Sequence, residues 1–123
     1  MIVGVGIDLI EIEKIAKNIH SKTFLRKIFT ESEITDCKSV VNSPERFAGK
    51  FAAKEAFMKA IGKGIHQEVW FIQIEVLNHE SGAPYVQVNG EAEASITKLG
   101  VKKIHASITH TKNIAAAVVI LEQ

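Results

Sequence analysis

Apolar residues alternate with small or polar ones at the start of the chain, which predicts a β-strand over Met1–Leu9. The alternation separates two sets of side chains: Val3, Val5, Ile7 and Leu9 on one face, and Gly4, Gly6 and Asp8 on the other. The glycines would leave room for a bulky group beside the Asp8 carboxylate. The alternative is that Asp8 caps the N-terminus of the next helix.

Helical periodicity follows, together with residues that begin and end helices. Apolar residues recur at helical spacing in two short segments: Ile12, Ile15, Ala16 and Ile19, then Phe24, Leu25, Ile28 and Phe29. Thr30–Glu33 matches a capping box, which predicts a helix that carries Ile34, Cys37 and Val41. Ser43 as N-cap and Pro44 as first helical residue would open a long helix that stops at Gly62 and Gly64.

The period changes to that of strands in the second half of the chain. Val69–Leu77 and Pro84–Val88 flank Ser81-Gly82 and are predicted to form a hairpin. A short helix over Glu91–Leu99 should follow, and then two strands, at Lys103–Ile108 and Ile114–Leu121. Because Ile114–Leu121 is apolar on both faces, we expect it at the centre of a sheet. Together these elements predict one α+β domain over residues 1–123.

Composition narrows the class of protein. Of 123 residues, 46% are apolar, and 15 basic against 14 acidic side chains give a net charge of +1. This balance predicts a packed core and argues against binding to nucleic acid or to a membrane surface. A single cysteine, Cys37, excludes an internal disulfide framework and a cysteine-rich zinc site. The apolar stretches are too short to span a bilayer and none reads as a signal peptide, so we expect a cytoplasmic protein.

The long predicted helix carries stripes of different character. A basic stripe, which we expect to be solvated, consists of Arg46, Lys50 and Lys54. A small-residue stripe suited to close packing consists of Gly49, Ala53, Ala56 and Ala60, and an apolar stripe of Phe47, Phe51, Met58 and Gly62. Glu55 and Lys59 lie one turn apart beside the apolar stripe. They could form a surface ion pair, but charges among apolar neighbours are costly unless they hold a ligand.

Asp8 and Glu55, with Lys59 nearby, suit a hard cation that binds phosphate oxygens. Mg²⁺ prefers oxygen ligands and is usually held by one or two protein carboxylates together with waters. The turn Gly62-Lys63-Gly64 adds backbone N–H groups beside a lysine, as a phosphate cradle would. An ordinary helix end has the same pattern.

A third cluster belongs to the predicted strand that begins at Lys103. Ser107 shares one face of this strand with His105 and Thr109, and His110 lies at its end. A hydrolase is not indicated, because no G-x-S-x-G sequence is present. Hydroxyls and imidazoles at a strand end could bind phosphate or polarise a nucleophile, and a histidine in a turn could also be simply solvated.

Three motifs occur in order along the chain: GVGIDLIEI near the start, RFAGKFAAKEAFMKAIGKGI in the middle and SITHTKNIAAAVVI near the end. In this combination they resemble the holo-acyl-carrier-protein synthase family, the short, trimeric type of phosphopantetheinyl transferase. The resemblance implies a homotrimer whose subunits pack an antiparallel sheet on a long helix. It also implies transfer of 4′-phosphopantetheine from coenzyme A to a serine of apo acyl carrier protein, for fatty acid biosynthesis, with release of adenosine 3′,5′-bisphosphate.

The resemblance also implies residue roles. Asp8 and Glu55 would hold Mg²⁺ together with the coenzyme A diphosphate, and Lys59 would neutralise phosphate charge. Ser107 and His110 would lie in the nucleotide pocket, and complete sites would form between neighbouring subunits. Three acceptors stay open for the proton of the serine hydroxyl: Glu55 through a water, His110, or a water held at the metal site, which we favour.

Acyl carrier proteins are acidic, so we expect the carrier to dock on basic residues. Lys14, Lys17, Arg26 and Lys27 fall on the expected exposed sides of two successive segments beside the strand that bears Asp8. Lys14 and Lys50 stand where many relatives would have arginine, which keeps the charge but loses bidentate geometry. Two other classes remain as alternatives, a magnesium-dependent nuclease and a non-catalytic oligomeric binding protein.

Overall fold

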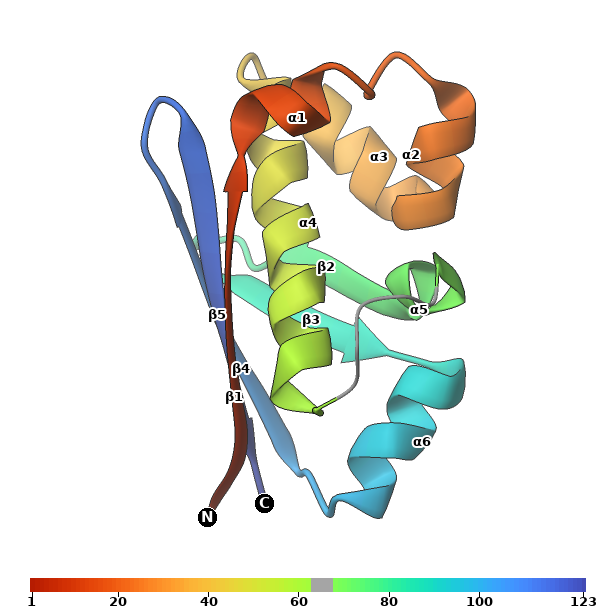
Figure 1. Cartoon of the computed structure of the whole chain (residues 1–123), viewed down its shortest axis with the longest axis vertical. Coiled ribbons are helices and arrows are strands. Elements are labelled where there is room, and N and C mark those ends of the chain that lie inside the picture. Colours follow the sequence, from red (N-terminus) through yellow and green to blue (C-terminus); the bar gives the residue numbers. More distant parts are fainter. Residues whose placement is uncertain (63–67) are drawn as a thin grey trace.

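Strands and helices follow one another along the chain in the computed structural model, which describes residues 1–62 and 68–123, the side chains of residues 68 and 69 excepted (Figure 1). The elements are β1 (Ile2–Glu11), α1 (Ile12–Ala16), α2 (Lys22–Ile28), α3 (Glu31–Lys38), α4 (Ser43–Ala60), α5 (Glu68–Gln73), β2 (Ile74–Asn78), β3 (Pro84–Val88), α6 (Gly90–Lys98), β4 (Lys103–His110) and β5 (Ile114–Glu122). They form an α+β fold, as predicted. Within the described ranges no helix is long and apolar enough to cross a membrane.

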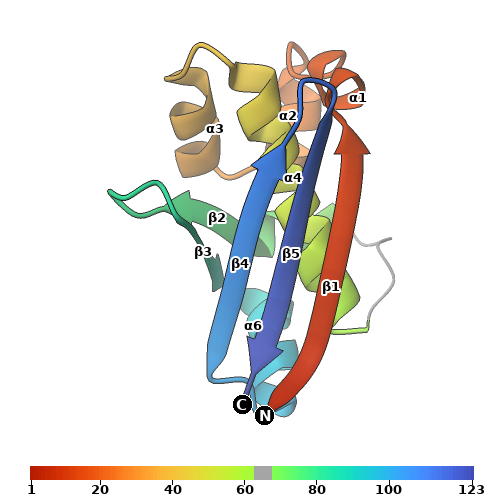
Figure 2. The ribbon, with the colours of Figure 1, turned by 90° about the vertical axis from the view of Figure 1, so that its left-hand side faces the viewer.

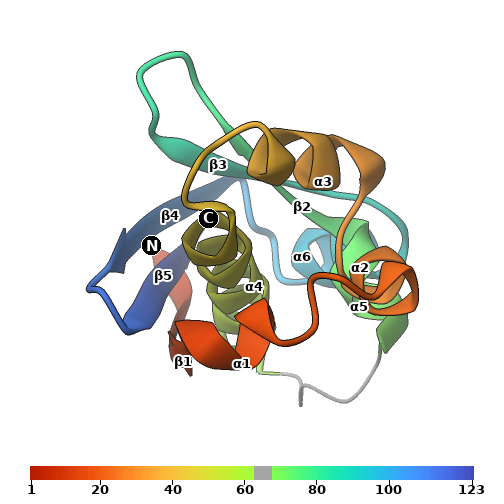
Figure 3. The ribbon, with the colours of Figure 1, turned by 90° about the horizontal axis from the view of Figure 1, so that it is seen from above.

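The larger of two sheets is built from the two ends of the chain. β1, β5 and β4 pair antiparallel with β5 in the middle, so the prediction that Ile114–Leu121 is a central strand is confirmed. β2 and β3 form a separate antiparallel pair. α4 packs along one face of the large sheet, and Figure 3 shows it between that sheet and the other helices.

Small residues let β1 and α4 approach closely. A Cβ atom at Gly6 would overlap the backbone oxygen of Ala56, and one at Gly4 would overlap that of Ala60. The small-residue stripe of α4 is therefore a packing surface, as predicted. The expectation of open space beside Asp8 is wrong, because the α4 backbone fills the space that the glycines leave.

The apolar face of β1 points away from α4. Val5, Ile7 and Leu9 are 58%, 64% and 68% exposed, whereas Asp8 on the opposite face is 7% exposed. The register pairs Val5 and Ile7 with two apolar residues of β5, Ile120 and Val118. The side of the sheet that α4 does not touch, here called the outer face, is therefore largely apolar. Figure 2 looks onto it and shows no helix of the described chain over it.

The capping box predicted at Thr30 is confirmed. Glu33 donates its backbone N–H to the Thr30 hydroxyl (3.3 Å), and its carboxylate accepts the Thr30 N–H (2.8 Å). α3 ends at Lys38, so Val41 lies outside the helix that was expected to carry it and is 99% exposed. Apolar character alone did not extend the helix to this position.

The boundaries of α4 differ slightly from the prediction. Asn42, rather than Ser43, is its N-cap residue, and Pro44 lies in its first turn. The helix ends at Ala60, and Gly62 follows with φ of 76°, in the left-handed region that favours glycine.

The basic stripe of α4 is not solvated, in contrast to the prediction. Lys50 and Lys54 are buried, Lys54 completely. The Lys54 ammonium donates to three oxygens: Ile28 O (2.7 Å), Glu33 Oε1 (2.6 Å) and Phe71 O (2.8 Å). Because α4 is enclosed by the sheet on one side and by α3 and β2 on the other, its polar stripe meets protein rather than water.

The strand predicted over Val69–Leu77 is wrong in its first half. Glu68–Gln73 form the helix α5, and β2 begins only at Ile74. The helical geometry buries Trp70 and stacks the ring of Phe71 on that of Phe51, with centroids 5.5 Å apart. A short apolar run fits a helix and a strand equally well, and tertiary packing decides between them.

Candidate active site

Asp8, Glu55 and Lys59 come together where β1 lies along α4. The Lys59 ammonium donates to Asp8 Oδ1 (3.0 Å) and to the backbone oxygen of Ile7 (3.1 Å). The Glu55 carboxyl group lies close enough to Asp8 that Asp8 helps to raise the pKa of Glu55. The close approach of β1 at Gly6 therefore brings one carboxylate from the strand to a carboxyl and an ammonium from the helix.

The two carboxyl groups cannot both be ionised at low cost. Burial raises the pKa of Glu55 to about 7, the hydrogen bond and the charge of Asp8 act in the same direction, and Lys59 acts against them. Asp8 Oδ2 is buried and has no hydrogen-bond partner among the residues that the structure describes. A buried carboxylate oxygen without a described partner, beside a second carboxyl group whose pKa is raised, marks a site that a bound cation would stabilise.

This set of donors fits a magnesium ion. Both side chains offer hard carboxylate oxygens, and Mg²⁺ commonly binds through one or two carboxylates while substrate phosphates and waters supply the other ligands. The described residues contain no cluster of three or more His, Cys, Asp and Glu side chains that could enclose a metal by themselves. The pair is therefore suited to a metal shared with a phosphate ligand.

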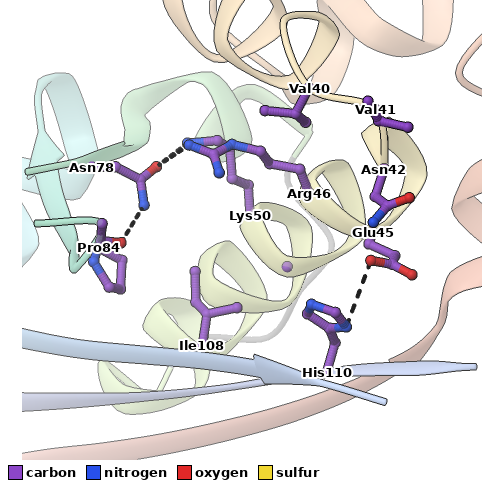
Figure 4. A pocket seen from close by; sticks show the side chains of 12 residues that line it. Val40, Val41, Asn42, Glu45, Arg46, Lys50, Asn78, Pro84, Ile108 and His110 are labelled. Atoms are coloured by element: carbon purple, nitrogen blue, oxygen red, sulfur yellow. Dashed lines mark hydrogen bonds and ion pairs between the residues drawn. The ribbon is translucent and has the colours of Figure 1, made fainter. Parts of the chain in front are cut away.

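A second functional region lies at the other edge of the sheet. A pocket of about 400 Å³ opens between the start of α4, the end of β4 and the β2–β3 pair. Figure 4 shows Arg46 and Lys50 on one side of this pocket, and His110 with Glu45 on another. Gly49 forms part of the wall against Ile108, and a Cβ atom at position 49 would crowd the Ile108 side chain.

The cations of this pocket are held by hydrogen bonds and ion pairs. Arg46 makes a bidentate contact with Asp36, from Nε to Oδ2 (2.8 Å) and from Nη2 to Oδ1 (3.1 Å). Lys50 donates to Val76 O (2.5 Å) and lies 3.3 Å from Asp36 Oδ2. The hydrogen bond from Arg46 is the main cause of a lowered pKa of Asp36, so this carboxylate stays ionised near neutral pH.

The predicted site residues divide between these regions and the rest of the chain. His110 lines the pocket, whereas Ser107 is exposed on the outer face of β4, because side chains alternate along a strand and Ile108 faces inward. Gly62 is exposed beyond the end of α4. Lys63 and Gly64 lie outside the described residues.

Sequence reasoning did not identify Arg46, Lys50 and Glu45 as pocket residues. The two cations belong to the stripe that was expected to be solvated, and their partner Asp36 carries no sequence signal. The sequence feature that came closest to indicating the pocket was Gly49, because the absence of a side chain there makes room for Ile108 of β4.

The four predicted docking residues are exposed. Lys14, Lys17, Arg26 and Lys27 lie on the solvent side of α1 and α2, while Ile15 and Leu25 point into the core. Lys14 also lines a hollow of about 390 Å³ between α1, β1 and α4, whose lining includes Glu55. This hollow leads from the basic side of α1 to the carboxylate pair.

The fold and the site together define a class of protein: a small α+β protein with a carboxylate pair suited to a metal–phosphate ligand and a separate pocket with basic residues. The family model of the 4′-phosphopantetheinyl transferase superfamily matches residues 4–119. A holo-[acyl-carrier-protein] synthase from Halothermothrix orenii is 40% identical over 100% of this chain and 99% of the relative. Another from Koribacter versatilis is 44% identical over 99% of each chain.

A solved structure agrees with the sequence comparison. The holo-(acyl-carrier-protein) synthase from Bacillus anthracis, crystallised in complex with CoA (3′,5′-ADP), superposes with a TM-score of 0.82 at 41% identity, over 100% of this chain and 98% of the other. This chain belongs to the 4′-phosphopantetheinyl transferase superfamily, in its group of holo-[acyl-carrier-protein] synthases. A nuclease or a non-catalytic binding protein is not favoured.

Proposed function

We propose that this chain transfers the 4′-phosphopantetheine group of coenzyme A to a serine hydroxyl of apo acyl carrier protein at the Asp8–Glu55–Lys59 site. The observation that carries this proposal is the pairing of the buried Asp8 with the half-buried Glu55, with one Asp8 oxygen that lacks a described partner and an ammonium group beside it. Such a pair suits a diphosphate that arrives with a hard cation. Relatives of the same length that bear the name of this activity support the reaction.

The reaction exchanges one phosphate ester for another. The serine oxygen forms a bond to the phosphorus that bears the pantetheine arm, and the bond from that phosphorus to the bridging oxygen breaks. The electron pair leaves with the second phosphate, as adenosine 3′,5′-bisphosphate, and the serine proton passes to a water at the site. Mg²⁺ held by Asp8 and Glu55 would supply positive charge for the diphosphate.

The chain's own residues orient the reactants and balance their charge. Lys59 is half-exposed, so its ammonium can reach a phosphate oxygen, and a cation held by Asp8 and Glu55 would replace it as the partner of the buried Asp8 carboxylate. Glu55, with a pKa of about 7, can hold or release a proton near neutral pH. His110, at the pocket beside Arg46 and Lys50, would contact the nucleotide part of coenzyme A.

We further propose that the site is completed by a second copy of the chain in a homotrimer. β1, which bears Asp8, and β4, which bears His110, are the two edges of the sheet and are separated by β5, a distance of about 10 Å across two strand spacings. The apolar outer face, with Val5, Ile7 and Leu9 exposed, supplies a surface that another copy could cover. Packing of outer faces would bring the carboxylate edge of one subunit to the pocket edge of its neighbour.

The acidic carrier would dock on Lys14, Lys17, Arg26 and Lys27. The hollow that joins Lys14 to Glu55 supports this placement, because a serine presented there would lie near the carboxylate pair. The reaction would take place in the cytoplasm, where a single buried thiol such as Cys37 is kept reduced.

Intact-mass measurement tests the activity directly. The purified chain is incubated with coenzyme A, Mg²⁺ and an apo acyl carrier protein, and the carrier should gain the mass of one phosphopantetheine. Omission of coenzyme A, addition of EDTA, or the Asp8→Asn variant should each prevent the gain. A carrier that stays unmodified with the parent protein and all components present would overturn the proposal.

A further inference from the structure

His110 is held at the edge of the nucleotide pocket by two oxygen atoms that face the same ring nitrogen. Its Nδ1 lies 3.2 Å from the backbone oxygen of Thr111 and 3.7 Å from Glu45 Oε2. The Thr111 oxygen can only accept, so Nδ1 carries the hydrogen of this hydrogen bond. The Glu45 carboxylate, at 3.7 Å, is too far for a second hydrogen bond and favours a hydrogen on Nδ1 through its charge. In the neutral ring this leaves Nε2 with a lone pair.

The Thr111 oxygen is fixed by its turn. The Thr111 backbone N–H donates to Ile114 O (2.8 Å), and its hydroxyl accepts from the backbone N–H groups of Asn113 (3.3 Å) and Ile114 (3.1 Å). The turn between β4 and β5 therefore presents this carbonyl in one orientation. Glu45 approaches the ring from the first turn of α4, as Figure 4 shows.

Glu45 is an acidic residue of the pocket that does not pair with the pocket cations Arg46 and Lys50 and instead faces His110. Arg46 and Lys50 are engaged by Asp36 and by the Asn78 side chain. The charged-group contact that Glu45 makes within the described chain is with the His110 ring, and it is an ion pair only when that ring is protonated. A carboxylate at the start of a helix is stabilised by the helix dipole, but that alone does not require an imidazole beside it.

We propose that Glu45 is a positioning residue for the transfer reaction, which fixes His110 in the Nδ1–H tautomer and presents Nε2 to the bound coenzyme A. The inference rests on the proposed function, because it assumes that His110 contacts this substrate. Glu45 itself touches no reacting atom. Its contribution comes from holding a ring that would otherwise rotate and exchange tautomers in solvent.

Two variants of Glu45 separate positioning from general stability. Glu45→Gln keeps a polar oxygen beside Nδ1, whereas Glu45→Ala removes it. We expect Glu45→Ala to lower kcat/KM for coenzyme A about ten-fold and Glu45→Gln to remain within about three-fold of the parent. Glu93→Ala, which removes an exposed acidic residue from the first turn of α6, is the matched control and should retain parent activity.

The tautomer is measured independently of the reaction. Long-range ¹H–¹⁵N NMR spectra of the free protein distinguish Nδ1–H from Nε2–H for His110. The parent and Glu45→Gln should show the Nδ1–H form, and Glu45→Ala should shift toward Nε2–H. In a His110→Gln background, Glu45→Ala should cost no further activity, because a residue that acts only through His110 has nothing left to position.

The outcomes discriminate between the two proposals. If the parent is active and Glu45→Ala matches it, or if its activity falls while the His110 tautomer is unchanged, the role of Glu45 is wrong and the proposed function stands. Additive losses in the double variant would also overturn the positioning role. If the parent itself transfers nothing from coenzyme A, the proposed function fails and the role of Glu45 fails with it.

Discussion

Two charged clusters on α4 differ in how completely they are satisfied. Around Lys54, three oxygens accept from the ammonium, and the Glu33 carboxylate accepts from Lys54, from Thr30 N and from Val76 N (2.7 Å). Around Asp8, one carboxylate oxygen accepts from Lys59, and the other is buried without a described partner. Lys54 and Glu55, the neighbour of Asp8, are consecutive residues of α4, yet the two clusters differ in how far their charges are balanced.

The difference shows which charges serve the fold and which serve the chemistry. A buried ion pair with every hydrogen bond made fixes the relative positions of α2, α3, α4, α5 and β2, because its donors and acceptors come from these five segments. A carboxylate pair with one ammonium beside it is instead costly to the folded protein, and a bound cation would relieve this cost. Removal of groups from the two clusters should therefore have opposite consequences.

The largest effect is expected from Lys54→Met. This change leaves the Glu33 carboxylate buried without its counter-ion, and should lower the free energy of unfolding by about 3–5 kcal/mol. Urea denaturation measures the loss. Addition of Glu33→Gln to Lys54→Met removes the unpaired charge and should recover a large part of it. If Lys54→Met alone were as stable as the parent, the hydrogen bonds and ion pair of Lys54 would not stabilise the fold.

The next largest effect is expected from Glu55→Gln, and it should fall on activity rather than stability. The amide keeps the size of the side chain but cannot provide a carboxylate ligand, so transfer at limiting Mg²⁺ should fall about 100-fold or more. The melting temperature at pH 8 should stay equal to that of the parent or rise, because a repulsive charge is gone. A variant with parent activity at limiting Mg²⁺ would remove Glu55 from the site.

The raised pKa of Glu55 predicts a pH dependence of stability. Between its ordinary value of 4.5 and the folded value of about 7, the folded protein holds a proton that the unfolded chain has lost. The stabilisation from this proton is present at low pH and is lost as pH rises toward and through about 7. In EDTA, the difference in melting temperature between parent and Glu55→Gln should therefore move in favour of the variant from pH 5 to pH 8. A difference in melting temperature that does not depend on pH would contradict the raised pKa of Glu55.

The comparison also shows what could be predicted from the sequence. Local signals were reliable where neighbouring residues decide the structure, as in the capping box at Thr30 and the glycine Gly62 at the end of α4. The burial of Lys50 and Lys54 could not be predicted, because their partners Asp36 and Glu33 lie on α3, a separate segment whose packing on α4 no local pattern reveals. Glu33 is both a capping residue and the counter-ion of Lys54, and the second role could not be predicted because it depends on the same packing of α3 on α4.

The same distinction applies to the candidate site residues, some of which could be placed from the sequence and some of which could not. Asp8 and Glu55 were identified from residue type and from a family resemblance, and the structure brings them together. Ser107 was assigned to the same pocket as His110, but strand alternation turns it to the outer face. The apolar face of β1 turns outward rather than toward the core, because the glycines on its other face let α4 approach closely.

The smallest effect is expected from a third set of charges, the exposed lysines and arginine of α1 and α2. These side chains are solvated, so their replacement should change stability little. They act on the encounter with an acidic carrier, a long-range attraction that salt screens over a Debye length of about 8 Å. Lys14→Glu with Arg26→Glu should therefore lower kcat/KM for the carrier about five- to ten-fold at low salt and flatten its salt dependence, with KM for coenzyme A little changed.

The matched control is Lys98→Glu with Lys102→Glu, the same change of charge on two exposed residues at the α6 end of the molecule, far from α1 and α2 in Figure 1. If both double variants respond to salt alike, net charge rather than a docking surface governs the encounter, and Lys14 and Arg26 have no particular role.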